Sequence, residues 1–176
     1  MTVMARYFLA LMIGLLLTVS VAAQSKRGPS TPEERSNAVK AARLLETDPF
    51  HKDAKKIREW FTLWLIEVPD ISIGICTDYL PGLYGTKNKN HESELVGQMM
   101  FSSAAFIIEH PDQAKDNVAV NLAGLEGTLK MYEAVLKTKP NAKISTLDQL
   151  LGKRDKGELK GYVEEIAATK CKEKKS

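Results

Sequence analysis

Residues 118–136 read VAVNLAGLEGTLKMYEAVL and carry the clearest helical pattern in this chain. Large apolar side chains recur there at alternating intervals of four and three residues, which places them along one side of a helix. We therefore expect one long helix over residues 112–139, with a buried seam. The residues of that seam are Val118, Leu122, Leu125, Leu129, Tyr132 and Leu136.

Two glycines within the same stretch indicate how this helix packs. Gly124 and Gly127 each lower helix propensity by up to about 1 kcal/mol relative to alanine. That cost is offset where the missing side chain lets another helix approach closely. Residues 102–105, which read Ser-Ser-Ala-Ala, offer a matching surface of small side chains. We expect the two segments to lie against each other.

The segment that contains these small residues, about 91–110, is apolar nearly all round. A helix with apolar side chains on every side is surrounded by its neighbours. Four polar residues within it argue against a lipid environment: Glu92, Glu94, Gln98 and Glu109. The segment is therefore predicted to be the central helix of the fold. Its apolar residues are Leu95, Val96, Met99, Met100, Phe101, Phe106, Ile107 and Ile108.

The helices before this one have clear boundaries. Thr31-Pro32-Glu33-Glu34 supplies a hydroxyl cap, a proline at the first helical position and the glutamate of a capping box. The helix that starts there stops at Asp48, because the residue before a proline is disfavoured in helical conformation. A second helix follows over about 53–68. Its inward stripe is predicted to be Ile57, Phe61, Trp64 and Val68.

Three further apolar residues of the second helix, Trp60, Leu63 and Ile66, lie off that stripe. More than one face of this helix must therefore be covered. Trp60 and Trp64 form a pair four residues apart that either binds a partner or packs in the core, and we favour core packing because their neighbours are apolar.

The remaining segments have weaker patterns. Residues 70–76 fit a strand by alternation or a short helix capped by Asp70; we favour the helix, because a lone strand has no partner for its backbone. Residues 81–90 form a loop by composition. Ser145 to Asp148 reads as a second capping box that starts a short helix. A last helix is expected from about Gly157, with Leu159 and Val163 facing inward.

These segments together predict an all-α protein. We expect a single globular domain of six or seven helices, arranged as a bundle or an orthogonal array around the buried central helix at about 91–110. The expected order along the chain is a signal peptide at 1–23, a flexible leader at 24–30, the helical domain at 31–172 and a frayed tail at 173–176.

The start of the chain has the three parts of a secretory signal peptide. Arg6 supplies positive charge, Tyr7 to Val21 is almost wholly apolar, and the small residues 21–23 form a cleavage site. The apolar run is shorter than the roughly 20 residues that a membrane-spanning helix needs. We expect cleavage after Ala23, with an uncleaved anchor as the alternative, and a periplasmic or secreted protein.

Size and charge narrow the class of protein. Cleavage would leave 153 of the 176 residues, a length typical of one domain that is stable without a metal. The formal net charge of the whole chain is +3, which is too small to indicate a nucleic-acid partner. The lysine clusters near the termini and in the loop are expected to be solvated.

The two cysteines, Cys76 and Cys171, are expected to meet. Export would place both in an oxidising compartment, and Cys171 extends the apolar face of the last helix. A bridge between them would close a loop of about 95 residues and contribute up to roughly 4–5 kcal/mol. Two buried free thiols are the alternative.

Metal and cofactor sites are not predicted. The three histidines, His51, His91 and His110, include no pair spaced as zinc ligands usually are. His91 does lie close to Glu92 and Glu94, but acidic residues also complement the positive start of a helix, and we favour that interpretation over a metal site.

The most specific ligand site that the sequence suggests lies on the loop at 78–91. Loops held by a rigid helical frame are where binding residues collect. A pocket there would be lined by Tyr79, Leu83 and Tyr84, with Asp78 and His91 as polar groups. The alternative, which we prefer, is that the tyrosines fold the loop onto the core.

The sequence favours a protein without catalytic activity. It contains no G-x-S-x-G, no H-E-x-x-H, no phosphate-binding glycine loop and no plausible cysteine–histidine pair. We expect an exported helical module that binds a protein or cell-envelope partner or serves as a structural accessory, with no membrane span after cleavage. One alternative is a small-ligand binder that uses the loop at 78–91. The other is a hydrolase whose catalytic residues the sequence does not identify.

Overall fold

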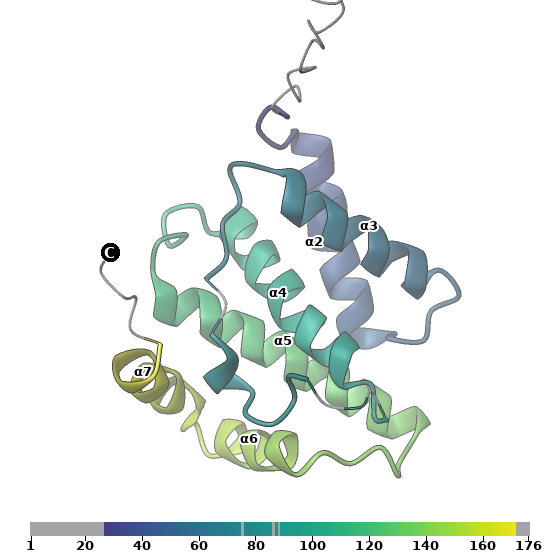
Figure 1. The fold of residues 1–176 in the computed structure, drawn as a ribbon, viewed down its shortest axis with the longest axis vertical. Helices are drawn as coiled ribbons and strands as arrows, with labels where there is room; N and C mark the ends of the chain where they lie inside the picture. The colour runs from purple at the N-terminus through teal and green to yellow at the C-terminus, as the bar shows by residue number, and fades with distance from the viewer. Residues whose placement is uncertain (1–26, 75, 86, 88, 172–176) are drawn as a thin grey trace, which may run out of the picture.

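The computed structural model describes residues 27–74, 76–85, 87 and 89–171 and shows an all-α single domain (Figure 1). The described residues form six α-helices and one 3₁₀ turn, η1, and contain no strand. The predicted signal peptide and the frayed tail lie outside the described residues. The elements are α2 (Pro32–Thr47), α3 (Ala54–Glu67), η1 (Thr77–Tyr79), α4 (Glu92–Glu109), α5 (Asn117–Thr138), α6 (Ser145–Asp155) and α7 (Leu159–Thr169).

Helices α4 and α5 pack against each other along the middle of the molecule, and this is the largest contact between elements. Helix α2 lies against both of them, and α3 contacts α2 and α4. Helices α6 and α7 cover α5 from the other side (Figure 1). In the part of the chain that the structure describes, no helix is both long and apolar enough to cross a membrane.

The close contact between α4 and α5 depends on small residues, as the sequence predicts. A Cβ atom added at Gly124 would lie 2.8 Å from the Met99 carbonyl oxygen and nearer still to the Ser103 hydroxyl. One added at Gly127 would overlap Ser102 and lie 2.7 Å from a carboxylate oxygen of Glu46. Real Cβ atoms do not approach other atoms so closely, so both positions require glycine.

The apolar core consists of two clusters that meet at α4. One cluster joins α5, α6 and α7 to η1 and the first half of α4, and includes Tyr79, Leu95 and Tyr132. The other joins α2 and α3 to the second half of α4, where the rings of Phe61 and Phe101 stack with centroids 4.3 Å apart. Nine residues of α4 are buried.

The starts of α2 and α6 follow the sequence prediction, whereas the start of α5 does not. Thr31 and Glu34 form the expected capping box. Helix α5 begins at residue 117 instead of 112, because the Asp116 carboxylate accepts the backbone N–H groups of Val118 and Ala119, both at 3.0 Å. Residues before Asp116 form turns.

The capping box predicted at Ser145 is wrong, because the carboxylate of Asp148 has another partner. The hydroxyl of Tyr132 donates to Asp148 at 2.8 Å and accepts the N–H of Ile144, also at 2.8 Å. Burial, the main cause, raises the pKa of Tyr132 to about 12, and the Asp148 carboxylate adds to this effect. Tyr132 thus ties the start of α6 to α5.

The short helix favoured over residues 70–76 is also wrong, and so is the alternative strand: the described residues 70–74 and Cys76 have no regular secondary structure. Asp70 does not cap a helix here. Its carboxylate accepts the backbone N–H of Ser30 at 2.8 Å, the hydroxyl of Ser30 at 2.7 Å and the guanidinium of Arg35 at 2.7 Å. Ile71 is buried against the α2–α3 cluster, so the chain follows the surface of that cluster.

The predicted disulfide is confirmed: Cys76 and Cys171 are bonded, with Cα atoms 5.8 Å apart. Cys76 directly precedes η1, and Cys171 follows the end of α7. The bridge therefore fastens the long irregular segment between α3 and α4 to the last helix.

The glycine requirement gives a first test. We expect Gly127→Ala to destabilise the protein by about 1–3 kcal/mol, because overlap with Ser102 and Glu46 outweighs the gain in helix propensity. Gly152→Ala in α6 is the matched control, since nothing lies within 4 Å of an added Cβ there. The control should be as stable as wild type or more so. Urea unfolding of both variants measures the difference, and equal effects would contradict the packing.

The disulfide gives a second test. Replacing both cysteines by serine should lower the free energy of unfolding by about 4–5 kcal/mol if the bridge acts mainly on the unfolded chain, since 95 residues separate the two cysteines. Intact mass before and after reduction confirms the bond, and denaturant unfolding gives the loss. A loss below about 1 kcal/mol would show that the bridge is not a main source of stability.

Candidate functional site

The loop residues suggested as a ligand site have two different surroundings. The side chains of Tyr79 and Leu83 are buried in the core, with only 1% and 3% of their surface exposed. The hydroxyl of Tyr162 on α7 donates to the carbonyl oxygens of Asp78 and Tyr79, both at 3.2 Å. These contacts fold the loop onto the core, which is the interpretation preferred from sequence.

His91 lies in a separate group of side chains. It precedes α4 in a left-handed conformation, with φ of 67°. Its ring packs edge-on against Phe50, with centroids 5.1 Å apart, and its Nε2 atom lies 2.9 Å from Nζ of Lys139. Its Nδ1 atom is 3.5 Å from the carboxylate of Glu94. Ligand binding by the loop at 78–91 stays a prediction.

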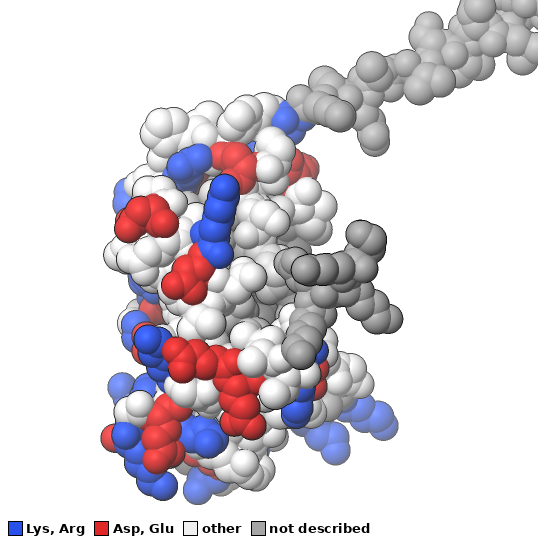
Figure 2. Space-filling view, turned by 90° about the vertical axis from the view of Figure 1, so that its left-hand side faces the viewer, with Lys and Arg blue, Asp and Glu red and all other residues white. Residues whose placement is uncertain are grey.

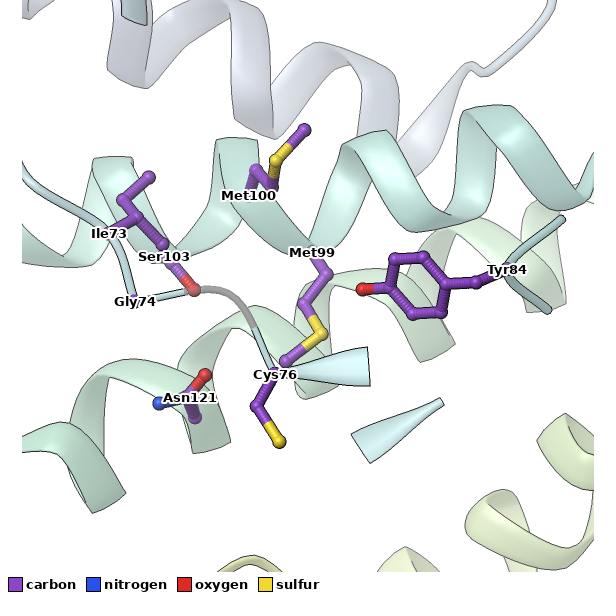
Figure 3. Close-up of a pocket in the computed structure, with 8 residues that line it drawn as sticks. All are labelled: Ile73, Gly74, Cys76, Tyr84, Met99, Met100, Ser103 and Asn121. Atoms are coloured by element: carbon purple, nitrogen blue, oxygen red, sulfur yellow. The ribbon is translucent and has the colours of Figure 1, made fainter. Parts of the chain in front are cut away.

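Two hollows adjoin this loop, and Figure 3 shows the first of them. The cavity in Figure 3 has a volume of about 10 Å³, room for about one water molecule. The hydroxyl end of Tyr84 points toward Met99 in it. It is lined by Ile73, Gly74, Cys76, Tyr84, Met99, Met100, Ser103 and Asn121. A neighbouring cleft beside the disulfide measures about 170 Å³ and includes Tyr79, Asn117 and Asn121. Both are smaller than the pockets of roughly 300 Å³ or more that hold drug-sized ligands.

The outer side of α3 is a larger candidate. The exposed fractions of Trp60, Leu63 and Ile66 are 38%, 60% and 75%. We call these three residues the α3 ridge. The sequence places all three residues of the ridge off the inward stripe of α3. Phe61 and Trp64, which belong to the inward stripe, are buried as predicted. The described chain leaves the ridge open to solvent.

The two tryptophans of α3 divide between the core and the ridge. Trp64 is 3% exposed, so core packing is confirmed for it, whereas the ring of Trp60 reaches the surface. The two rings are stacked with centroids 6.0 Å apart. Trp60 is thereby held by a buried ring, and its exposed edge has a defined position.

A groove runs along one side of the ridge, between α2 and α3. It has a volume of about 450 Å³, and its lining includes Leu44, Ile57 and Trp60 together with polar residues of α2. A second open hollow, of about 380 Å³, lies on α3 itself at Arg58, Glu59, Thr62 and Leu63. The ridge adjoins these open hollows through Trp60 and Leu63 and has charged residues at its borders, which suits a macromolecule better than a small enclosed ligand.

The charges of α3 are placed against its own dipole. Lys55 and Lys56 lie in its first turn and Glu67 is its last residue, while its first turn contains no acidic residue and its last turn no basic one. A helix is stabilised by the reverse arrangement, because its N-terminus carries partial positive charge and its C-terminus partial negative charge. Lys55 forms an ion pair with Glu59 and Glu67 forms one with Arg27, both at 3.8 Å, but exposed pairs of this kind contribute little to stability.

Charge elsewhere is mixed in sign. On the face drawn in Figure 2, acidic and basic side chains lie next to one another.

Sequence reasoning missed one group of charged and polar side chains, which lies inside the protein. The carboxylate of Glu46 on α2 is 3% exposed and accepts hydrogen bonds from Arg43 at 2.6 Å and from the Ser102 hydroxyl at 2.8 Å. Glu46 follows Ala42 by four residues, so its place on the inward face was readable from the sequence.

This internal group has a structural role. The amide nitrogen of Gln98 donates to the carbonyl oxygen of Ala42 at 3.1 Å and to the Ser102 hydroxyl at 2.9 Å. Lys130 of α5 approaches Glu46 at 3.7 Å. The group therefore joins α2, α4 and α5. Ser102 is fully buried, so the serine–glutamate pair has no open path to a substrate.

The described residues contain no group of three or more histidine, cysteine, aspartate or glutamate side chains that could hold a metal ion. The chain matches no family model, and neither curated proteins nor solved structures show a match to it. The geometry of this chain is therefore the basis on which its function is inferred.

The position of the α3 ridge depends on Asp70, which joins the chain after α3 to the start of α2. Partial burial alone would raise the pKa of Asp70, but the hydrogen bonds from Ser30 and Arg35 outweigh it and lower the pKa from 3.8 to about 2. The carboxylate is thus more acidic in the folded chain. Its contribution to stability is complete above about pH 4 and is lost as the pH falls from there to about 2.

We expect Asp70→Asn to lower the free energy of unfolding at pH 7 by about 1 kcal/mol, allowing for solvent screening of this surface group. The difference from wild type should shrink as the pH falls from 4 to 2, because protonation removes the same interaction from wild type. Denaturant unfolding at several pH values measures both effects. A difference that is constant with pH would show that the charge of Asp70 is unimportant.

Proposed function

We propose that this protein is an exported, non-catalytic helical module that binds a macromolecular partner through the α3 ridge. One observation carries the proposal: three large apolar side chains of one helix are exposed side by side, next to a groove. Contiguous apolar surface of this kind marks interaction sites in soluble proteins, and a stacked tryptophan at its edge is typical of residues that dominate binding energy.

Export is part of the same proposal. It rests on the apolar segment from Tyr7 to Val21 and on the small residues before Gln24, which lie outside the described residues. The Cys76–Cys171 disulfide supports it, because such bonds persist in oxidising compartments. We propose a periplasmic or secreted location and a protein or cell-envelope partner.

A binding role also agrees with the polar groups in the described part of the chain. The buried carboxylate of Glu46 is matched by Arg43 and Ser102, and the Tyr132 hydroxyl by Asp148. The Glu46–Ser102 and Tyr132–Asp148 pairs connect helices, so these polar groups hold the fold together. The small-ligand alternative has one feature in its favour, the cleft of about 170 Å³ at Tyr79 and Asn121, but its volume limits it to a very small molecule.

Site-specific crosslinking tests the proposal. A photoreactive amino acid at Thr62, beside Leu63 in the hollow on α3, should give a light-dependent adduct in the exported fraction of the producing cells. The same amino acid at Glu164, an exposed residue of α7, should give none. Adding Leu63→Asp should remove the adduct without unfolding the protein, because Leu63 is 60% exposed. Equal labelling from Thr62 and Glu164, or none, would reject the α3 ridge as a binding surface.

A further inference from the structure

The charged residues at the ends of the α3 ridge follow its own spacing. Lys56, Trp60, Leu63 and Glu67 are separated by four, three and four residues, so they lie along one stripe of the helix. The stripe has a cation at one end, an anion at the other and apolar side chains in the middle. All four side chains are exposed.

We propose that the partner is a second copy of this chain, bound by antiparallel pairing of the two α3 helices. This inference rests on the proposed function of the α3 ridge and names its occupant. A two-fold axis between residues 61 and 62 places Trp60 of each copy opposite Leu63 of the other. The same axis places Lys56 opposite Glu67 at both ends. The stripe is therefore complementary to itself, as an isologous interface requires.

The antiparallel arrangement also accounts for the charges that oppose the helix dipole. In such a pair, the N-terminus of one α3 lies beside the C-terminus of the other. Lys55 and Lys56 then lie near the negative end of the second helix, and Glu67 lies near its positive end. Charges that are unfavourable in one copy become favourable in the pair.

Glu67 forms an exposed ion pair within its own chain, and enough of its side chain faces solvent to meet Lys56 of a second copy as well. Its nearest described cation, Arg27, is 3.8 Å away, and 61% of the Glu67 side chain is exposed. Charge does not favour a membrane surface in the same way, because Glu59 and Glu67, both 61% exposed, offset much of the attraction of the α3 lysines for anionic headgroups. A parallel pair of α3 helices would bring Lys56 against Lys56 and Glu67 against Glu67.

The test is a charge exchange in the chain as the producing cell processes it. Lys56→Glu alone places like charges at both ends of the pair, and so does Glu67→Lys alone. An equal mixture of the two variants restores opposite charges at both ends, although each chain keeps its substitution. Sedimentation equilibrium gives the dimer dissociation constant, and circular dichroism checks that each variant is folded.

We expect wild type to dimerise reversibly with concentration, and each variant to have a dissociation constant raised about tenfold, as two exposed pairs change sign. The mixture should recover the wild-type constant by forming mixed dimers. Lys160→Glu and Glu164→Lys on α7 are the matched controls, since they make the same charge changes at exposed positions. Both should dimerise as wild type does.

Other outcomes separate this inference from the proposed function. A protein that stays monomeric while Thr62 crosslinks to a different protein would overturn the inference and keep the proposed function. So would a monomer that binds vesicles of phosphatidylglycerol through the ridge. A monomer without any adduct would overturn both. A dimer that neither variant weakens, or that mixing does not restore, would overturn the antiparallel pairing.

Discussion

The close approach of α4 and α5 is the constraint on which the rest of the structure depends. It exists because Gly124 and Gly127 present bare backbone to Ser102 and Ser103. With the two helices this close, α4 offers buried residues to both apolar clusters, and α2 can reach α4 and α5 together. Larger residues at these two positions would separate the helices and disturb the buried contacts of Glu46.

The internal polar group around Glu46 determines how the packed helices are oriented relative to one another. Apolar side chains accept many relative positions at similar energy, whereas the carboxylate of Glu46 needs its partners at defined distances. Its hydrogen bond from Ser102 of α4 and its ion pair with Lys130 of α5 therefore define how α2 lies on the α4–α5 pair. The same attachment positions α3, which contacts α2 and α4 and carries the exposed ridge. The interior and the proposed binding surface are linked in this way.

Sequence reasoning predicted the parts of the fold that depend on local periodicity. The middle of the α5 seam, the Thr31 cap and the glycine contact follow from residue spacing within one helix or from matched residue sizes. The outer seam residues Val118, Leu122 and Leu136 are only partly buried. Sequence reasoning failed where a side chain has a distant partner. Asp70 looks like a helix cap but bonds Ser30 and Arg35, and Asp148 looks like half of a capping box but accepts from Tyr132. No local pattern distinguishes these uses.

The candidate site shows the same limit. The sequence separated Trp60, Leu63 and Ile66 from the inward stripe of α3, but it could not show that no described element covers them. That fact depends on where α2 and α4 lie. The sequence analysis also grouped Tyr79 and His91 because they are close along the chain. In the structure Tyr79 contacts α7, whereas His91 contacts Phe50 and Lys139.

The Cys76–Cys171 bond has a consequence for the order of events in the life of the chain. Ribosomes make Cys76 first, and the segments of α4, α5 and α6 all follow before Cys171 emerges. The bond can therefore form only in a chain that already contains the segments of α2 to α7. The bond in a purified sample therefore reports that the molecule was synthesised through residue 171 and met an oxidant.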